Sequence, residues 1–244
     1  MNSVDFKDWV LGKDLNDPFS GCDGGDPGSE RSPSTWLFGL EWGDPKSVNA
    51  RAVSECSNAD VNYSIETQIR RWPFNRNAFK LLSSIYAGDI NSYREFAHRE
   101  QPFVKGQKGY FKGNLYPLGF NNLSAWNDEA IALSGFLTKE DYIEWARRER
   151  LSVVRCWIQK YKPKLFIGAG IGFLHDFLNA LGTKSYTEHR FEANNIRRRI
   201  FLGSVGETVF AIVPHLSGGR FGLTSTDSIS LAGHIIRERL LHNS

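Results

Sequence analysis

The sequence predicts an α/β protein, a three-layer α/β/α domain built on a central four-stranded, mostly parallel sheet. Two observations predict this class. Several short apolar runs are each followed by a Gly or Pro turn, which is typical of strands buried inside a parallel sheet. Helical patterns lie between these runs, and such alternation places helices on both faces of the sheet. The 244 residues, 41% hydrophobic and 23% charged, are enough for a single globular domain spanning residues 1–244.

Each expected element follows from a local pattern. The strand runs are 36–40, 164–169 and 209–213, and a weaker fourth candidate is 114–118. Helical patterns cover 74–86, 139–162, 171–181 and 228–241, and Pro163 and Gly182 end the second and third of them. Residues 16–34 are rich in Gly, Pro, Ser and Asp, which predicts a loop or a flexible arm.

Composition argues against several kinds of protein. Cys22, Cys56 and Cys156 are widely spaced and form no CxxC pair, so neither a disulfide framework nor a usual zinc or iron–sulfur site is expected. The segment MNSVDFKDWV carries acidic residues and no long apolar run. We therefore expect a cytoplasmic protein without a membrane span, a cofactor, a metal or an obligate protein partner. The net charge of +3 is compatible with nucleic-acid binding without requiring it.

The residues that follow each strand are the candidates for a site, because parallel α/β sheets bind ligands outside the carboxyl ends of their strands. GLEWGDP (39–45) follows the first strand, and PHLSGGRFG (214–222) follows the third. The second strand ends in GAGIG (168–172), whose last glycine falls one position too early for the dinucleotide-binding pattern. A plain tight turn and a nucleotide-binding turn both remain open for that segment.

Together, the first and third of these segments resemble the signature motifs of the uracil-DNA glycosylase superfamily. There, an early strand ends in Gly-x-x-Pro-Gly or Gly-Gln-Asp-Pro-Tyr, and a late strand ends in His-Pro-Ser-Pro before a loop that enters DNA. KYKPKLFIGAGIGFLHDFL (160–178) and RWPFNRNAFKLLSSIY (71–86) resemble further parts of that superfamily, in matching order over residues 36–241. The resemblance implies the superfamily's fold. It also implies an enzyme that flips a base out of double-stranded DNA and hydrolyses its bond to the sugar.

Hydrolysis of an N-glycosidic bond develops positive charge on the sugar and negative charge on the departing base. The resemblance assigns Glu41 to the water and the sugar, and His215 to a hydrogen bond with the carbonyl oxygen of the leaving base. Asp44 is the competing carboxylate. The alternatives are a solvated loop carboxylate at position 41 and a surface or packed histidine at position 215.

The expected base pocket has two further members. Asn114 resembles the superfamily's asparagine that reads the base edge, since an amide both donates and accepts, and Asn121 and Asn122 are its rivals. Phe74 is the candidate for stacking on the flipped base, with a plain core position as the alternative. The basic run Arg197–Arg199 lies in a loop-like stretch and is a candidate contact to phosphate or to a sugar carried by the base.

The loop after the third strand supplies the expected DNA contacts. Ser217 and the backbone of Gly218 and Gly219 would hold phosphates, because glycines let the backbone come close. Arg220 and Phe221 would fill the hole that the flipped base leaves. An ordinary Gly-rich turn is the alternative.

Departures from the superfamily motifs bear on the substrate. Trp42 replaces a proline, and Gly43 stands where uracil-specific members place a tyrosine that excludes substituents at the pyrimidine 5-position. Unless Trp42 refills that space, we expect a pyrimidine with a bulky 5-substituent, such as glucosylated hydroxymethylcytosine of phage DNA. The chain resembles the modified-base glycosylases proposed for antiphage defence. The alternatives are a uracil or mismatch DNA glycosylase, a catalytically inactive DNA-binding module of the same fold, and a nucleotide-binding regulator using 168–172.

Overall fold

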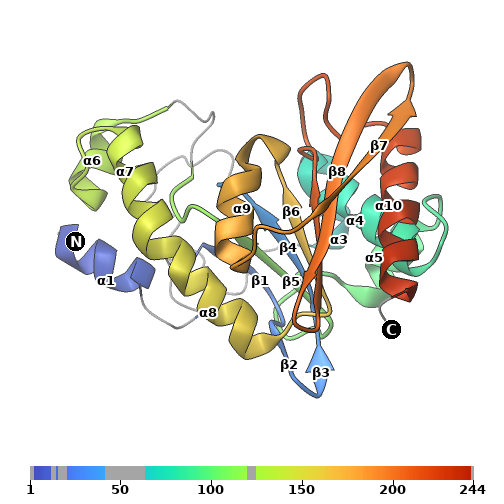
Figure 1. Cartoon of the computed structure of the whole chain (residues 1–244), viewed down its shortest axis with the longest axis horizontal. Coiled ribbons are helices and arrows are strands. Elements are labelled where there is room, and N and C mark those ends of the chain that lie inside the picture. The colour runs from blue at the N-terminus through green and yellow to red at the C-terminus, as the bar shows by residue number, and fades with distance from the viewer. Residues whose placement is uncertain (1–2, 12–14, 16–20, 42–63, 120–124, 243–244) are drawn as a thin grey trace.

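The computed structural model describes residues 3–11, 15, 21–41, 64–119 and 125–242, which form an α/β protein (Figure 1). One sheet runs through them in the order β1-β5-β4-β6-β9-β8-β7. Its four central strands are parallel, and they are β5 (Tyr110–Asn114), β4 (Thr35–Gly39), β6 (Leu165–Ala169) and β9 (Thr208–Val213). The outer strands pair antiparallel with their neighbours, and they are β1 (Cys22–Gly25) at one edge and β8 (Ile196–Val205) followed by β7 (Thr187–Ala193) at the other. The α/β class with parallel central strands is confirmed, whereas the expected four-stranded sheet accounts only for the centre of the sheet.

Helices cover both faces of this sheet (Figure 1). One face carries α1 (Ser3–Leu11), α6 (Asp128–Ser134), α7 (Lys139–Trp145), α8 (Leu151–Tyr161) and α9 (Leu174–Leu181). The other face carries α3 (Ile65–Arg71), α4 (Pro73–Tyr86), α5 (Tyr93–Glu100) and α10 (Thr226–Leu241). No helix in the described ranges is long and apolar enough to cross a membrane.

Alternation along the central strands supplies both cores, which is why these strands read as continuous apolar runs. In β4, Trp36 and Phe38 pack on the α8 side of the sheet, while Leu37 packs on the α4 side. The expected helix at 139–162 is one helical stretch in which a π-helical turn, Ala146–Arg150, joins α7 to α8. It ends at Tyr161, and Lys162 takes a left-handed backbone conformation (φ 45°) just before Pro163.

The expected fourth strand at 114–118 was wrong, because the strand is 110–114 and Asn114 ends it instead of starting it. Its sequence, YFKGN, contains a lysine and a glycine, so it does not read as an apolar run. Gly113 is required by packing: a Cβ there would lie 2.8 Å from Cζ of Phe38 on the neighbouring strand. The correction moves Asn114 to the carboxyl edge of the sheet.

Two stretches expected as loops contain strands. The basic run at 197–199 lies in β8, which forms a hairpin with β7 through a turn at Asn194 and Asn195, both with positive φ (54° and 58°). Part of the expected arm at 16–34 forms β1, and a separate small pair follows it, β2 (Gly28–Ser29) with β3 (Ser32–Pro33). The strands in the first stretch alternate polar with apolar residues, and those in the second are short. Neither stretch therefore shows the continuous apolar run that is typical of a central strand.

Candidate active site

The candidate site lies at the carboxyl edge of the parallel strands, where Phe74 of α4 meets Asn114 of β5 and His215 after β9. The ring centroids of Phe74 and His215 are 5.6 Å apart. Gly39, the last residue of β4, lies between Phe74 and Asn114. The Cβ position that it lacks is 3.7 Å from Cζ of Phe74 and 2.6 Å from Oδ1 of Asn114. A side chain at this glycine would therefore occupy the space that the aromatic ring and the amide share.

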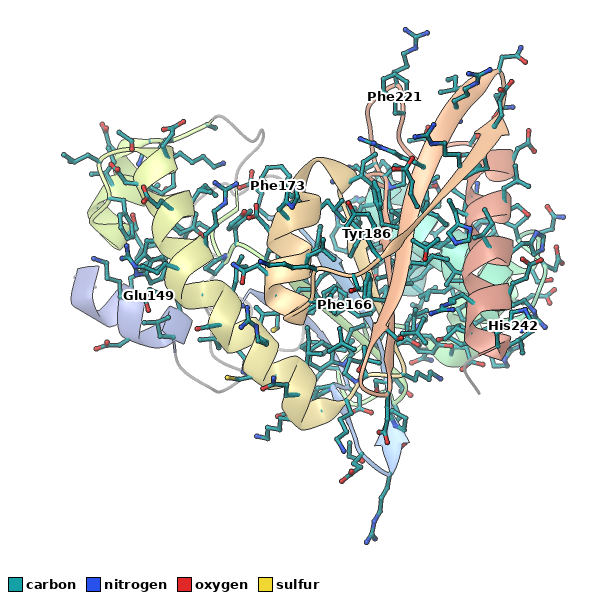
Figure 2. All side chains as sticks on the ribbon, in the orientation of Figure 1. Glu149, Phe166, Phe173, Tyr186, Phe221 and His242 are labelled. Carbon is teal, nitrogen blue, oxygen red and sulfur yellow. The ribbon has the colours of Figure 1, made fainter. Side chains whose placement is uncertain are left out.

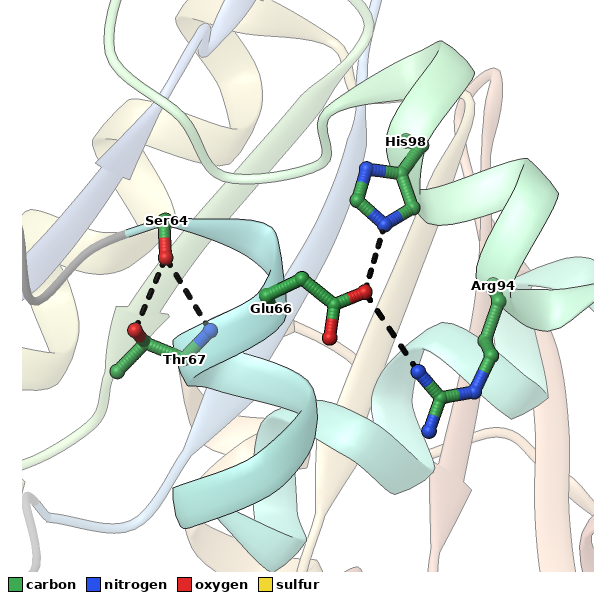
Figure 3. A network of polar contacts seen from close by, with 5 residues as sticks. All are labelled: Ser64, Glu66, Thr67, Arg94 and His98. Atoms are coloured by element: carbon green, nitrogen blue, oxygen red, sulfur yellow. Dashed lines mark hydrogen bonds and ion pairs between the residues drawn. The ribbon is translucent and has the colours of Figure 1, made fainter.

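The start of α4 positions Phe74 at the carboxyl edge of the sheet. Ser64 caps α3 by accepting a hydrogen bond from the backbone N–H of Thr67, and Glu66 pairs with His98 (2.9 Å) and Arg94 (3.6 Å) of α5 (Figure 3). Because these groups are half-exposed, the ion pairs orient α3 more than they stabilise it. The chain then turns and starts α4, which places the half-buried Phe74 in its first turn.

The side-chain amide of Asn114 is held by acceptors. Its Nδ2 donates to the carbonyl oxygen of Gly21 (3.3 Å) and to Oδ1 of Asp23 (3.1 Å), and the other carboxylate oxygen of Asp23 pairs with Lys112 Nζ at 2.5 Å. Lys112 Nζ in turn lies 5.3 Å from the Phe74 ring centroid. Sequence reasoning missed Asp23 and Lys112. Lys112 could have been found, because it precedes Asn114 by two residues and alternation along a strand places both on one face. No local sequence pattern indicated Asp23.

His215 is arranged as a neutral hydrogen-bond donor. The backbone N–H of Ser217 donates to its Nδ1 at 3.3 Å, and the Ser217 hydroxyl lies 3.1 Å from the same nitrogen. Because a backbone N–H only donates, Nδ1 acts as an acceptor and the ring proton sits on Nε2. Burial lowers the pKa of His215 below its ordinary value, which favours the neutral ring at pH 7. The ring therefore offers an Nε2–H donor beside Phe74.

Glu41 follows β4, but no contact joins its carboxylate to Phe74, Asn114 or His215 in the described residues. It lies instead against α7, where Lys139 Nζ is 3.1 Å from Oε1 and 3.0 Å from Oε2, and both side chains are only 6% exposed. The ammonium therefore pairs with both carboxylate oxygens. Burial raises the pKa of Glu41 to about 6, although Lys139 opposes the rise. The result is a buried carboxylate that is mostly ionised at pH 7.5 and is held by one ammonium.

The loop from His215 to Leu223 projects from the same edge. The N–H of Leu223 donates to the carbonyl of His215 at 2.9 Å and closes the loop, and the buried Leu216 and Leu223 anchor it. Gly222 has no room for a side chain, since a Cβ there would lie 2.3 Å from the carbonyl oxygen of Gly218. Phe221 is 57% exposed, and Figure 2 shows it at the far tip of the loop.

The remaining members of this loop are open to solvent. Ser217, Gly218, Gly219 and Arg220 are exposed, and a Cβ at either glycine would meet nothing within 4 Å. Gly219 has φ 82°, a left-handed conformation that favours glycine. The expected phosphate-binding and wedge residues thus form one accessible surface beside the site.

The three arginines of the 197–199 run differ in burial and in their contacts. Arg198 is buried and donates hydrogen bonds to the carbonyl oxygens of Gly222 (3.1 Å) and Ala193 (2.8 Å), so it ties the hairpin to the 215–223 loop. Its expected contact with phosphate or a sugar is therefore wrong. The side chains of Arg197 and Arg199 are 93% and 55% exposed, and alternation in β8 puts both on the opposite face from Arg198.

The glycines of the 168–172 turn have packing functions. A Cβ on Gly168 would lie 2.7 Å from Phe177 and 2.8 Å from Ile212, and one on Gly170 (φ 143°) would lie 3.1 Å from Leu40. Gly172 has open space instead. Close packing accounts for Gly168 and Gly170, so neither glycine requires a bound nucleotide to explain it.

Some expected site residues lie outside the described residues, and they are Trp42, Gly43, Asp44, Asn121 and Asn122. Two surface hollows lie elsewhere. One of about 350 Å³ includes Lys164 and Glu207 at the opposite edge of the sheet, and one of about 570 Å³ includes Arg155 and His175 beside α8 and α9. The described side chains hold no group of three or more metal-ligating residues.

No protein-family model matches the chain, and no curated protein matches it.

Proposed function

We propose that this protein is a DNA glycosylase that flips a modified pyrimidine out of DNA and hydrolyses its N-glycosidic bond. The observation that carries the proposal is that Phe74 lies beside His215 and, at the bare backbone of Gly39, also approaches Asn114. An aromatic ring, an amide and a neutral imidazole donor are the groups that a flipped base needs for stacking, edge reading and stabilisation as it leaves. The parallel central strands with helices on both faces support the three-layer fold of the uracil-DNA glycosylase superfamily.

The proposed chemistry assigns one task to each group. The base stacks on Phe74, and its edge meets the amide of Asn114. His215 donates from Nε2 to the carbonyl oxygen that gains negative charge as the bond breaks. Glu41 accepts a proton from the attacking water, and the carboxylate stabilises the positive charge that develops on the sugar.

The exposed loop at 217–221 supplies the duplex contacts. Phe221 enters the stack where the base has left, and Ser217, Gly218, Gly219 and Arg220 meet the phosphates. This mechanism needs neither a metal nor a cofactor. The substrate we propose is a cytosine with a bulky 5-substituent, such as glucosylated hydroxymethylcytosine of phage DNA, and its excision leaves abasic sites as an antiphage defence.

The test incubates the purified protein with three DNAs: unmodified, uracil-containing, and phage DNA with glucosylated hydroxymethylcytosine. Abasic sites are counted and the released base is identified by mass. We expect abasic sites and free modified base only with the phage DNA. Release from uracil DNA alone would instead make the protein a uracil-repair glycosylase.

Variants separate catalysis from binding. His215→Asn should lower the single-turnover rate by about 10²-fold, because it removes the donor to the leaving base. His234→Asn, a matched change at an exposed position on α10, should leave the rate unchanged. If the wild-type protein binds DNA but releases no base from any of the three DNAs, the protein is a binding module and the proposal is wrong.

A further inference from the structure

The amide of Asn114 faces the site with a fixed orientation, and this orientation bears on which base the site accepts. We propose that Asp23 is a specificity residue that makes Asn114 a hydrogen-bond acceptor, so that the site selects bases with an amino group at the pyrimidine 4-position. The inference rests on the proposed function and names its substrate class: 4-amino pyrimidines, the cytosine type, over 4-oxo pyrimidines, the uracil type.

The chemistry of the neighbours fixes the amide. Both partners of the Asn114 side chain, the Gly21 carbonyl at 3.3 Å and the Asp23 carboxylate at 3.1 Å, are acceptors. A rotation of the amide by 180° would set its oxygen against these oxygens, so Nδ2 must face them. Both of its hydrogens are thereby directed away from the shared space at Gly39.

The oxygen of the same amide lies against Gly39, at the position where a Cβ would also contact Phe74. Oδ1 of Asn114 accepts no hydrogen bond from the described residues, and it lies 2.6 Å from the missing Cβ position of Gly39. Phe74 Cζ is 3.7 Å from that same point. A base stacked on Phe74 would therefore present its edge to an oxygen.

Lys112 keeps Asp23 in the role of acceptor. Lys112 Nζ lies 2.5 Å from Asp23 Oδ2, and the two side chains are only 14% and 12% exposed. An ammonium has only donors, so the carboxylate oxygen that faces it acts as an acceptor. Asp23 thus accepts from both Lys112 and Asn114, and this shared acceptor fixes the orientation of the amide.

Cytosine and uracil differ in what they offer to such an oxygen. Cytosine presents a donor, its 4-amino group, whereas uracil presents the acceptor O4 at the same place. A hydrogen bond forms in the first case, and two oxygens oppose each other in the second. Sites built to bond one group reject the analogue without it strongly, and we expect a preference of about 10²-fold or more for the amino form.

The experiment uses single-stranded oligonucleotides, because pairing strength then cannot bias base flipping. Four bases are compared: the 5-hydroxymethyl and 5-glucosyloxymethyl forms of cytosine and of uracil. Single-turnover release is followed by mass. The wild-type protein should release each cytosine form about 10²-fold faster than its uracil counterpart. This wild-type ratio tests the proposal without any variant.

Asp23→Asn tests the residue itself. Lys112 would draw the oxygen of the new amide, so its NH₂ would face Asn114 and favour the rotated amide that presents a donor to the base. The cytosine-to-uracil ratio should fall by at least about 10-fold. Asp89→Asn, the same change at an exposed site remote from the carboxyl edge, should leave the ratio unchanged.

The outcomes separate this inference from the function on which it rests. Equal or faster release of the uracil forms overturns the inference while the glycosylase activity stands. An unchanged ratio in a folded Asp23→Asn variant overturns the role of Asp23. Release of none of the four bases overturns the proposed function, and the inference with it.

Discussion

Replacing Lys139 by methionine should move the pH dependence of base excision, because Lys139 is the group that opposes the high pKa of Glu41. Lys139 Nζ lies 3.0–3.1 Å from both carboxylate oxygens, and burial raises the pKa of Glu41 to about 6 even with this cation in place. A cation this close lowers the pKa of a carboxyl by about 1 to 3 units. In Lys139→Met, we therefore expect the pKa of Glu41 to lie between about 7 and 9.

The assay is the pH profile of kcat/KM for release of the modified base. If ionised Glu41 activates water, the acid limb should move from about pH 6 in the wild type to between about pH 7 and 9 in Lys139→Met. At pH 7 the rate should fall by about 2-fold to 10²-fold. Lys139→Arg keeps the charge and should keep the limb near that of the wild type. His215 titrates below its ordinary pKa in all three proteins, so its contribution does not move with position 139.

Stability gives an independent readout of the same pair. The pKa of Glu41 is raised from 4.5 to about 6, so its protonated form favours folding. That contribution is fully present below pH 4.5 and is lost as the pH rises through about 6, for a total of about 2 kcal/mol. In Lys139→Met the loss should extend to higher pH, seen as a lower free energy of unfolding at pH 8. An acid limb and a stability profile that both stay in place in the folded variant would refute this account of Glu41.

Three further predictions follow from the loop, the hairpin and the glycine turn. Phe221→Ala should slow excision from duplex DNA by about 10-fold and leave single-stranded DNA nearly unaffected, which paired single-turnover assays would detect; equal losses on both would exclude a wedge. Replacing Arg197 and Arg199 by alanine should reduce the salt dependence of DNA binding by up to about 2 in log–log slope, measured by titration at several salt concentrations. Gly168→Ala should destabilise the protein by about 1–3 kcal/mol, since its Cβ would lie 2.7 Å from Phe177, whereas Gly172→Ala should not; melting curves without added nucleotide decide this.

The strand-end rule could be applied from sequence because it needs only the ends of apolar runs. It pointed to the segments that contain Gly39 and His215, whereas the resemblance to the superfamily supplied Asn114, and Phe74 was proposed for stacking. Sequence reasoning misplaced the strand that carries Asn114, because the buried residues 115–118 that follow this strand look more apolar than the strand itself. The strand with Lys112 and Gly113 in its middle depends on tertiary packing against Phe38. Such packing produces no alternating hydrophobic pattern that could be recognised in the sequence.

Local sequence patterns could not identify the partners of Glu41 and Asn114. Glu41 and Lys139 are 98 positions apart, and Asp23 and Asn114 are 91 apart. Each pair forms only when distant elements become neighbours in the fold. For Asp23, this requires β1 to pair with β5 at the edge of the sheet, and the Gly-rich sequence of β1 does not predict a strand there. Sequence therefore proposed the groups of the candidate site, while the groups that set their charge and orientation required the fold.

Asp23 and Glu41 are both paired with a lysine, but they contact different groups. Asp23 accepts a hydrogen bond from the Asn114 amide through Oδ1 and pairs with Lys112 through Oδ2. Glu41 pairs with Lys139 through both of its oxygens. Under the proposed function, Glu41 acts on the hydrolysis that all bases share, whereas Asp23 acts on the residue that reads the base. Glu41→Gln should then slow the release of every base by a similar factor, whereas Asp23→Asn should change the ratio between bases, because only the first alters a step that all substrates share.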